Sequence, residues 1–219
     1  MKNCNASKNL TARRILSRAS ATALAVAFAA SLAQPAQADN VTQPNVPESL
    51  RVQAGYSPFL VGHANGTQNY VCAPDPLVPG SPIKWRLYTP QATLLTDADK
   101  QIVTHFFSPK PGDNTSFLPT WQHSRDSSRV WVVPAALPYS DPDFVEPGAI
   151  DWLLLGAVAS ESGPTGGDTL TKTAYIQRVN TSGGKPPAFG CSEGELGYKV
   201  FVPYTADYYF YMKDAGPVE

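Results

Sequence analysis

The residues whose types could do chemistry lie far apart in this chain of 219 residues, and only one short catalytic motif occurs among them. Gly190-Cys191-Ser192-Glu193-Gly194 matches the pattern G-x-S-x-G, in which a serine nucleophile sits on a sharp turn from a strand into a helix. Two prolines precede this motif and the residues after it favour a strand, so no helix is expected there. We therefore expect a turn that carries a disulfide cysteine rather than a catalytic serine.

Carboxylates and histidines provide a second set of candidates. A hydrolase that cleaves glycosides needs two carboxylates about 5–9 Å apart, in environments that separate their pKa values. Asp151, Glu161 and Asp207 are the candidate carboxylates for that reaction. More generally, a hydrolase that uses Asp, Glu or His predicts a cleft in which at least two of the following residues converge: His105, His123, Asp151, Glu161 and Asp207. The alternative is that these side chains are structural, for example through an ion pair between Arg178 and Asp207.

The sequence predicts no metal site and no cofactor. His63, His105 and His123 lack the clustered spacing that metal sites favour, although His105 and His123 could approach each other across the fold. The acidic residues of segment 141–146 lack the glycine and the spacing of a calcium-binding loop. No G-x-G-x-x-G motif joins a predicted strand to a helix, which argues against a dinucleotide.

Aromatic residues are the most suggestive feature of the chain. Tyr208-Tyr209-Phe210-Tyr211 carries rings on both faces of a predicted strand, which is more than one core face needs. One set is expected to pack inward and the other to form a platform for sugar rings or apolar ligands. The candidate ligand-binding residues are Trp121, Trp131, Tyr204, Tyr209 and Tyr211. A fully buried barrel strand and a subunit interface stay open as alternatives.

The first 38 residues have the features of a signal peptide. They contain five basic residues and no acidic one, an apolar stretch over residues 21–32, and the cleavage pattern Ala36-Gln37-Ala38. The stretch is shorter than the roughly 20 apolar residues that a membrane-spanning helix needs. We expect a periplasmic or secreted protein that begins at Asp39 and has no transmembrane segment, with a retained N-terminal helix as the alternative.

The expected mature chain carries 12 basic and 18 acidic residues, a net charge of −6. No basic run remains after cleavage, which argues against nucleic acid as a partner. Cys72 and Cys191 are the two cysteines left, an even pair in an oxidising compartment, so they are expected to form one disulfide. Two free buried thiols are the alternative.

Short segments of alternating polarity predict an all-β domain, an antiparallel sandwich or barrel. A flexible leader is expected over residues 39–48 and a single domain over residues 49–219, with an exposed loop at 108–128. The expected strands are residues 68–72, 83–88, 101–107, 130–133, 151–159, 173–179, 198–202 and 206–212.

Several blocks together resemble the domain-of-unknown-function family 3455, which occurs in exported bacterial proteins and in fungi. The most specific are Gly190-Cys191 and residues 202–211; the others are residues 69–72, 84–85, 90–94, 105–106, 119–121, 150–154, 176–181 and 183–184. Residues 108–118 depart from the pattern by their length. The resemblance supports pairing Cys72 with Cys191, since both fall in matching blocks, and it implies no activity.

The hypothesis favoured by these features is a non-enzymatic binding module. Its partner would be a glycan, a cell-envelope component or an apolar small molecule, bound through the aromatic residues. The alternatives are the secreted hydrolase described above and a structural envelope protein with no small ligand.

Overall fold

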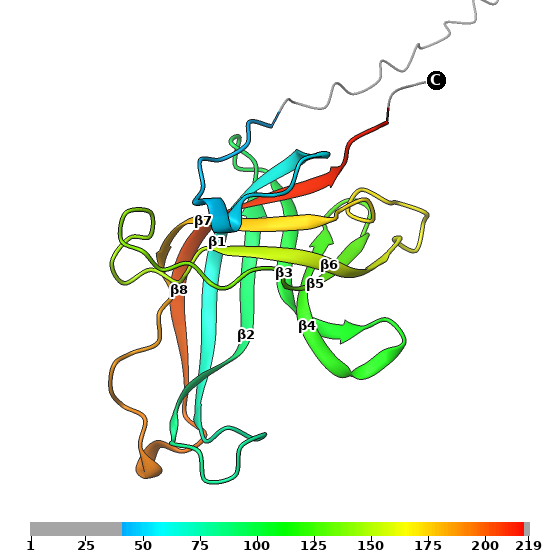
Figure 1. Cartoon of the computed structure of the whole chain (residues 1–219). Coiled ribbons are helices and arrows are strands. Elements are labelled where there is room, and N and C mark those ends of the chain that lie inside the picture. The colour runs from blue at the N-terminus through cyan, green and yellow to red at the C-terminus, as the bar shows by residue number, and fades with distance from the viewer. Residues whose placement is uncertain (1–40, 217–219) are drawn as a thin grey trace, which may run out of the picture. The chain divides into compact units, whose positions relative to one another are not determined.

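The computed structural model describes residues 41–216 (Figure 1). These residues form a closed barrel of eight antiparallel strands, each paired with its neighbours in sequence, and the last strand pairs with the first. The expected all-β class is confirmed, as a barrel rather than a sandwich. The expected signal peptide, residues 1–38, lies outside the described residues, so its cleavage stays a prediction.

The described part contains two short 3-10 turns and no α-helix. Turn η1 is Glu48–Leu50 and turn η2 is Glu193–Glu195. The strands are β1 Tyr56–Ala73, β2 Lys84–Leu95, β3 Gln101–Lys110, β4 Asp113–His123, β5 Arg129–Pro134, β6 Leu153–Glu161, β7 Tyr175–Gly183 and β8 Lys199–Lys213. None of the helical turns in residues 41–216 has the length or the apolar content needed to span a lipid bilayer.

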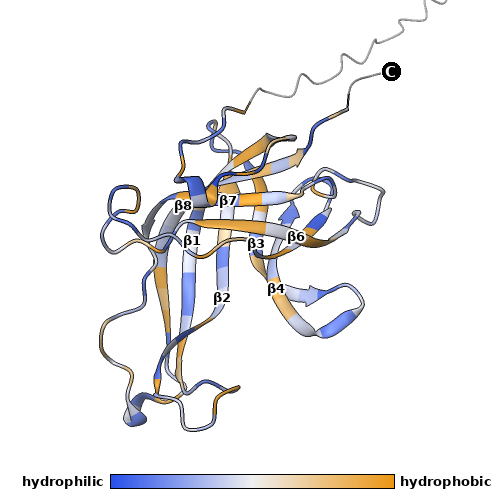
Figure 2. Ribbon diagram, viewed as in Figure 1, coloured by the Kyte–Doolittle hydropathy of each residue, from blue (hydrophilic) through white to orange (hydrophobic). Residues whose placement is uncertain are grey.

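Alternation along each strand divides the side chains between the barrel interior and its outer face. On β8, Tyr204, Tyr208 and Phe210 are buried in the interior core, where they meet residues such as Leu94 and Ile176. Figure 2 shows apolar residues concentrated on β3, β6, β7 and β8. The ring-rich segment of β8 therefore fills the barrel with one of its two faces.

A second apolar cluster covers the outside of β6, β7 and β8. Val46 and Leu50 from the N-terminal segment pack there with Trp152, Val179 and Tyr211. Gln177 holds the N-terminal segment against the barrel, because its amide donates a hydrogen bond to the Leu50 carbonyl at 2.6 Å. The end of the expected flexible leader is thus packed against the barrel.

One end of the barrel is closed by the loop between β6 and β7. Leu170 from this loop is buried in the interior core. The loop is held by Asp126, whose carboxylate accepts hydrogen bonds from the backbone and the hydroxyl of Thr169. Ser128 adds a hydrogen bond from the Leu170 amide to its hydroxyl at 3.0 Å.

Two projections extend from the opposite end (Figure 1). The first is an arm formed by the ends of β1, β2 and β8, and the second is the hairpin of β3 and β4. Cys72 on β1 and Cys191 in the loop before β8 form a disulfide in the arm, as expected. Above the arm, β1 and β2 approach so closely that a Cβ on Gly66 would lie 2.1 Å from the Gln91 carbonyl oxygen.

The expected exposed loop at residues 108–128 is wrong, because β4 occupies most of it. The presence of Pro109 and Pro119 favoured a loop over strands in this segment, since proline usually interrupts a β ladder. In the structure Phe107 pairs with Pro119 and Ser108 with Leu118, and Trp121 of β4 is buried in the barrel.

Candidate ligand cavity at the open end of the barrel

A cavity of about 130 Å³ lies inside the barrel at the end from which the arm and the hairpin project. Every strand contributes to its wall: Gln68 from β1, Leu87 and Pro90 from β2, His105 and Phe107 from β3, Pro119 and Trp121 from β4, Pro134 from β5, Leu153 and Leu155 from β6, Arg178 from β7 and Tyr208 from β8. The wall is mainly apolar and carries a few polar groups, as binding sites for small molecules do.

Two buried hydrogen-bond donors in this wall have no protein acceptor. Six buried side-chain polar atoms lack a partner in the described residues, and two of them, Gln68 Nε2 and Trp121 Nε1, line the cavity. Gln68 is 3 % exposed and Trp121 is 1 % exposed. The Gln68 side chain lies close enough to the Tyr204 hydroxyl to oppose slightly the rise that burial causes in the pKa of Tyr204, but the contact lacks hydrogen-bond geometry at Nε2. The hydrogen bond of the Tyr204 hydroxyl is with the Tyr208 hydroxyl at 3.2 Å.

Arg178 is the cationic residue of the cavity wall. Its Nε and Nη2 atoms donate to the backbone carbonyl of Asp151, at 3.1 and 2.7 Å. No carboxylate in the part of the chain described lies within ion-pair distance of Arg178. Arg178 is half-buried, and its hydrogen-bond partner among the described residues is a peptide carbonyl.

His105 is a neutral member of the wall. Its ring stacks on Trp121 with centroids 3.9 Å apart, and its Nδ1 atom lies 3.0 Å from the Thr120 carbonyl oxygen. Burial lowers the pKa of the imidazole to about 3; the hydrogen bond to Thr120 opposes this shift and the charge of Arg178 adds to it. Nδ1 consequently carries the proton that it donates to Thr120, and the ring holds no charge at neutral pH.

Nearby tyrosine hydroxyls are also uncharged. The Tyr70 hydroxyl donates to the Gly184 carbonyl at 2.7 Å, and burial raises its pKa to about 12, a shift that Arg178 partly opposes. Burial likewise raises the pKa of Tyr204 well above its ordinary value. The only formal charge in the cavity wall is thus that of Arg178.

The five aromatic residues expected to bind a ligand do not form one surface. Trp121 lines the cavity and Tyr204 lies in the interior core. Trp131 is buried and faces outward, where its Nε1 atom donates to the Ser108 hydroxyl at 2.9 Å. Tyr211 is buried in the outer cluster and donates to Gln177, while Tyr209 is half-buried beside His63 on the outer wall.

The residues of the hydrolase hypothesis are not brought together. No hydrogen bond or ion pair within residues 41–216 joins any two of them. His123 contacts Asp126 at 3.0 Å, Glu161 lies 3.8 Å from Arg129, and Asp151 offers only its carbonyl to Arg178. The expected ion pair between Arg178 and Asp207 is also absent, because residue 178 faces the interior and residue 207 the outside.

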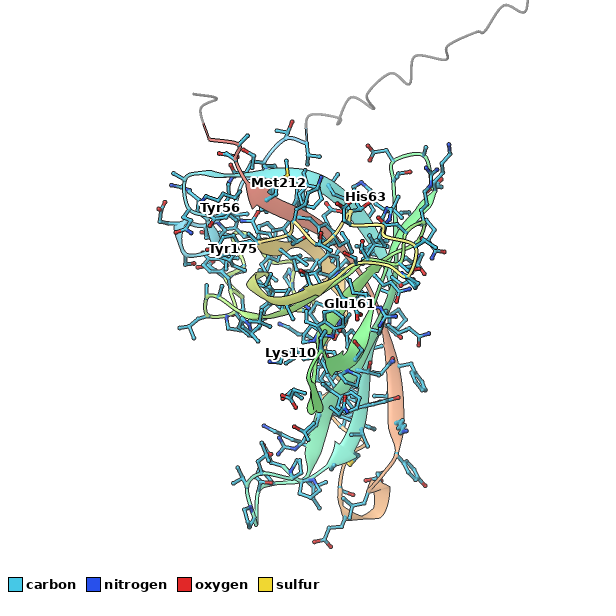
Figure 3. The ribbon with its side chains drawn as sticks, turned by 90° about the vertical axis from the view of Figure 1, so that its right-hand side faces the viewer. Tyr56, His63, Lys110, Glu161, Tyr175 and Met212 are labelled. Carbon is cyan, nitrogen blue, oxygen red and sulfur yellow. A yellow bond between two sulfur atoms is a disulfide. The ribbon has the colours of Figure 1, made fainter. Side chains whose placement is uncertain are left out.

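Asp207 instead belongs to a cluster on the outer wall. The two ring nitrogens of His63 lie 2.7 Å from Asp207 and 2.8 Å from Asp97, and Asn180 donates to the second oxygen of Asp207 at 2.7 Å. Burial lowers the pKa of His63, but the two carboxylates outweigh it and raise the pKa above its ordinary value. His63 lies high on the barrel, away from Lys110 of the hairpin (Figure 3).

The serine motif and the acidic segment have structural roles. Ser192 and Glu195 form a reciprocal cap on the turn η2, and Cys191 is in the disulfide, so the motif lacks the strand-to-helix turn that catalysis needs. Asp141 accepts the Asp143 backbone amide in a turn. No group of three metal-ligating side chains occurs in residues 41–216.

Comparison with known protein families gives a match. The model of a family described as "Protein of unknown function (DUF3455)" matches residues 53–212, which include all of β1 to β7 and all of β8 except its last residue. The searches of the curated proteins and of the solved structures returned no match.

Proposed function

Because the chain belongs to the DUF3455 family, whose description assigns no function, we propose from the geometry that this barrel binds a small molecule in its open-end cavity without transforming it. The observation that carries the proposal is the pair of unpartnered donors, Gln68 Nε2 and Trp121 Nε1. A ligand with a hydrogen-bond acceptor on an apolar body would complement both the donors and the wall.

The energetic argument rests on burial. A buried donor without an acceptor destabilises a fold by about 1–3 kcal/mol, and native proteins contain few of them. Two such donors in one small cavity are explained if a bound molecule supplies the acceptors. Barrels of eight strands are also the size at which the interior is either filled or holds one small ligand.

The cavity size limits the class of ligand. Its 130 Å³ lies below the range of about 300–1,000 Å³ typical of drug-sized ligands, so the cavity admits a small molecule or one end of a longer one. The mainly apolar wall favours an apolar molecule over a glycan among the partners considered. The hydrolase alternative has no supporting contact among the described residues.

The test is nuclear magnetic resonance of the oxidised protein with a panel of small apolar acids, amides and esters. Trp121→Phe identifies the indole N–H signal of Trp121. We expect ligands to shift that signal and to leave the indole signal of Trp131 unchanged, since Trp131 already donates to Ser108 outside the cavity. If no member of the panel moves the Trp121 signal at millimolar concentration, the binding proposal is wrong.

We also propose that the protein works in the periplasm or outside the cell. The support is the disulfide, which persists in oxidising compartments, together with the signal-like N-terminal sequence. Fractionation of cells that express the full chain tests this: we expect a product that begins at Asp39 in the exported fraction. A cytosolic product that retains residues 1–38 would contradict it.

A further inference from the structure

Arg178 gives the cavity a charge preference. We propose that the ligand is an apolar carboxylic acid whose carboxylate binds Arg178 at the open end of the barrel. This inference rests on the binding function proposed above and names the chemical class of the ligand.

The first support is the state of the guanidinium. Its Nε and Nη2 atoms donate to the Asp151 carbonyl, and Nη1 has no protein acceptor in residues 41–216. An arginine fork normally pairs with a carboxylate or a phosphate through two parallel hydrogen bonds. Here the backbone carbonyl fixes one edge of the guanidinium, so the group is oriented before any ligand arrives.

The second support is the one-sided polarity of the cavity. No acidic side chain lines it, and the buried Gln68 and Trp121 both present N–H donors without acceptors. A carboxylate accepts at about four lone-pair sites, which matches a wall that carries several donors. An ammonium ligand would meet donors and a like charge, so the same geometry disfavours a cation.

The third support is the apolar wall beyond the donors. Leu87 lines the cavity and is 45 % exposed, so the wall continues from the cavity onto the arm. Phe117 lies two residues from Pro119 on β4 and is 59 % exposed on the hairpin. A cavity of this size holds the carboxylate and the first carbons of a chain, and a longer tail would leave the cavity past the exposed side chain of Leu87.

Titration calorimetry with matched probes tests the inference on the unmodified, oxidised protein. Hexanoate and hexanamide have chains of equal length, and only the first is charged at pH 7.5. Because charge-assisted hydrogen bonds are about twice as strong as neutral ones, we expect hexanoate to bind at least about tenfold more tightly than hexanamide. Decanoate should bind more tightly still, since its tail covers more apolar surface.

Substitutions of Arg178 supply the second arm. Arg178→Met should abolish the preference for the acid, whereas Arg178→Lys should retain it with lower affinity. Arg129→Met is the matched control, because Arg129 pairs with Gln122 and Glu161 outside the cavity, and it should leave both affinities unchanged.

The two proposals fail in different ways. If acid and amide bind alike and both move the Trp121 signal, the charge inference is wrong and the binding function stands. If neither probe nor any other member of the panel binds, the binding function itself fails. Should Arg178→Met not fold, the comparison of hexanoate with hexanamide on the unmodified protein still decides.

Discussion

Replacing Gln68 with methionine should stabilise this protein while weakening its ligand binding. Methionine has nearly the same length as glutamine and carries no donor. The change removes a buried amide whose Nε2 atom has no acceptor, and such a group destabilises a fold by about 1–3 kcal/mol. For a domain of this size each kcal/mol raises Tm by about 2–4 °C, so Gln68→Met should raise Tm by about 2–12 °C.

Gln177→Met is the matched control with the opposite sign. Gln177 is fully buried, like Gln68, but its amide donates to the Leu50 carbonyl and accepts from the Tyr211 hydroxyl. The same substitution there leaves two buried groups unpaired, the Leu50 carbonyl and the Tyr211 hydroxyl, which should reduce the free energy of unfolding by about 2–6 kcal/mol.

The assay is urea unfolding of the oxidised protein, followed by tryptophan fluorescence, with thermal melts in parallel. Equal slopes against urea for the variants would show that the midpoint differences report stability. If Gln68→Met destabilises the protein as much as Gln177→Met does, the Gln68 amide is paired in solution and the reasoning on the cavity is refuted.

Three further predictions concern the scaffold. Reducing the disulfide should lower the free energy of unfolding by about 4–5 kcal/mol on the chain-entropy model, because it closes a loop over a separation of 119 residues; equal urea midpoints with and without reductant would contradict this. Gly66→Ala should destabilise the protein by about 3 kcal/mol, because its Cβ would overlap β2. Gly156→Ala is the control and should cause no such loss, since the Cβ there meets only an ordinary contact at 3.6 Å. Similar melting curves for the two variants would count against the close approach of β1 and β2. The raised pKa of His63 should add stability that is fully present below about pH 6.5 and is lost as the pH rises through the folded-state pKa. Tm measured from pH 5.5 to 8.5 should show this pH dependence in the unmodified protein and lose it in His63→Gln. An identical pH profile of Tm in the variant would exclude the effect.

The sequence predicted the barrel strands well where alternation was clean. On β8 the inward positions 208 and 210 and the outward positions 209 and 211 follow from the period of two alone, and the disulfide followed from an even pair of cysteines. Residues 108–128 were missed because Pro109, Pro119 and the turn between β3 and β4 interrupt the pattern, although a proline fits a strand where its missing N–H is not needed.

The cavity was less predictable because it depends on register. Gln68 and Arg178 stand at inward positions of β1 and β7, which could have marked them as polar residues in an apolar interior. Identifying them requires knowing which face of each strand points inward, and β1 carries polar residues on both faces. Trp131 was expected at the surface, yet it is covered, because Ser108 of β3 reaches it from a segment that was expected to be a loop.

All eight strands contribute to the wall of the cavity, so the cavity exists only when the barrel is closed. The strand pair most distant in sequence joins β1 to β8, with His63 and Asp207 in contact across 144 residues of sequence. Until these two strands pair, the donors of β1 and the arginine of β7 have no common space to face. A ligand would then recognise only complete molecules, slowing their unfolding while leaving the rate of folding nearly untouched.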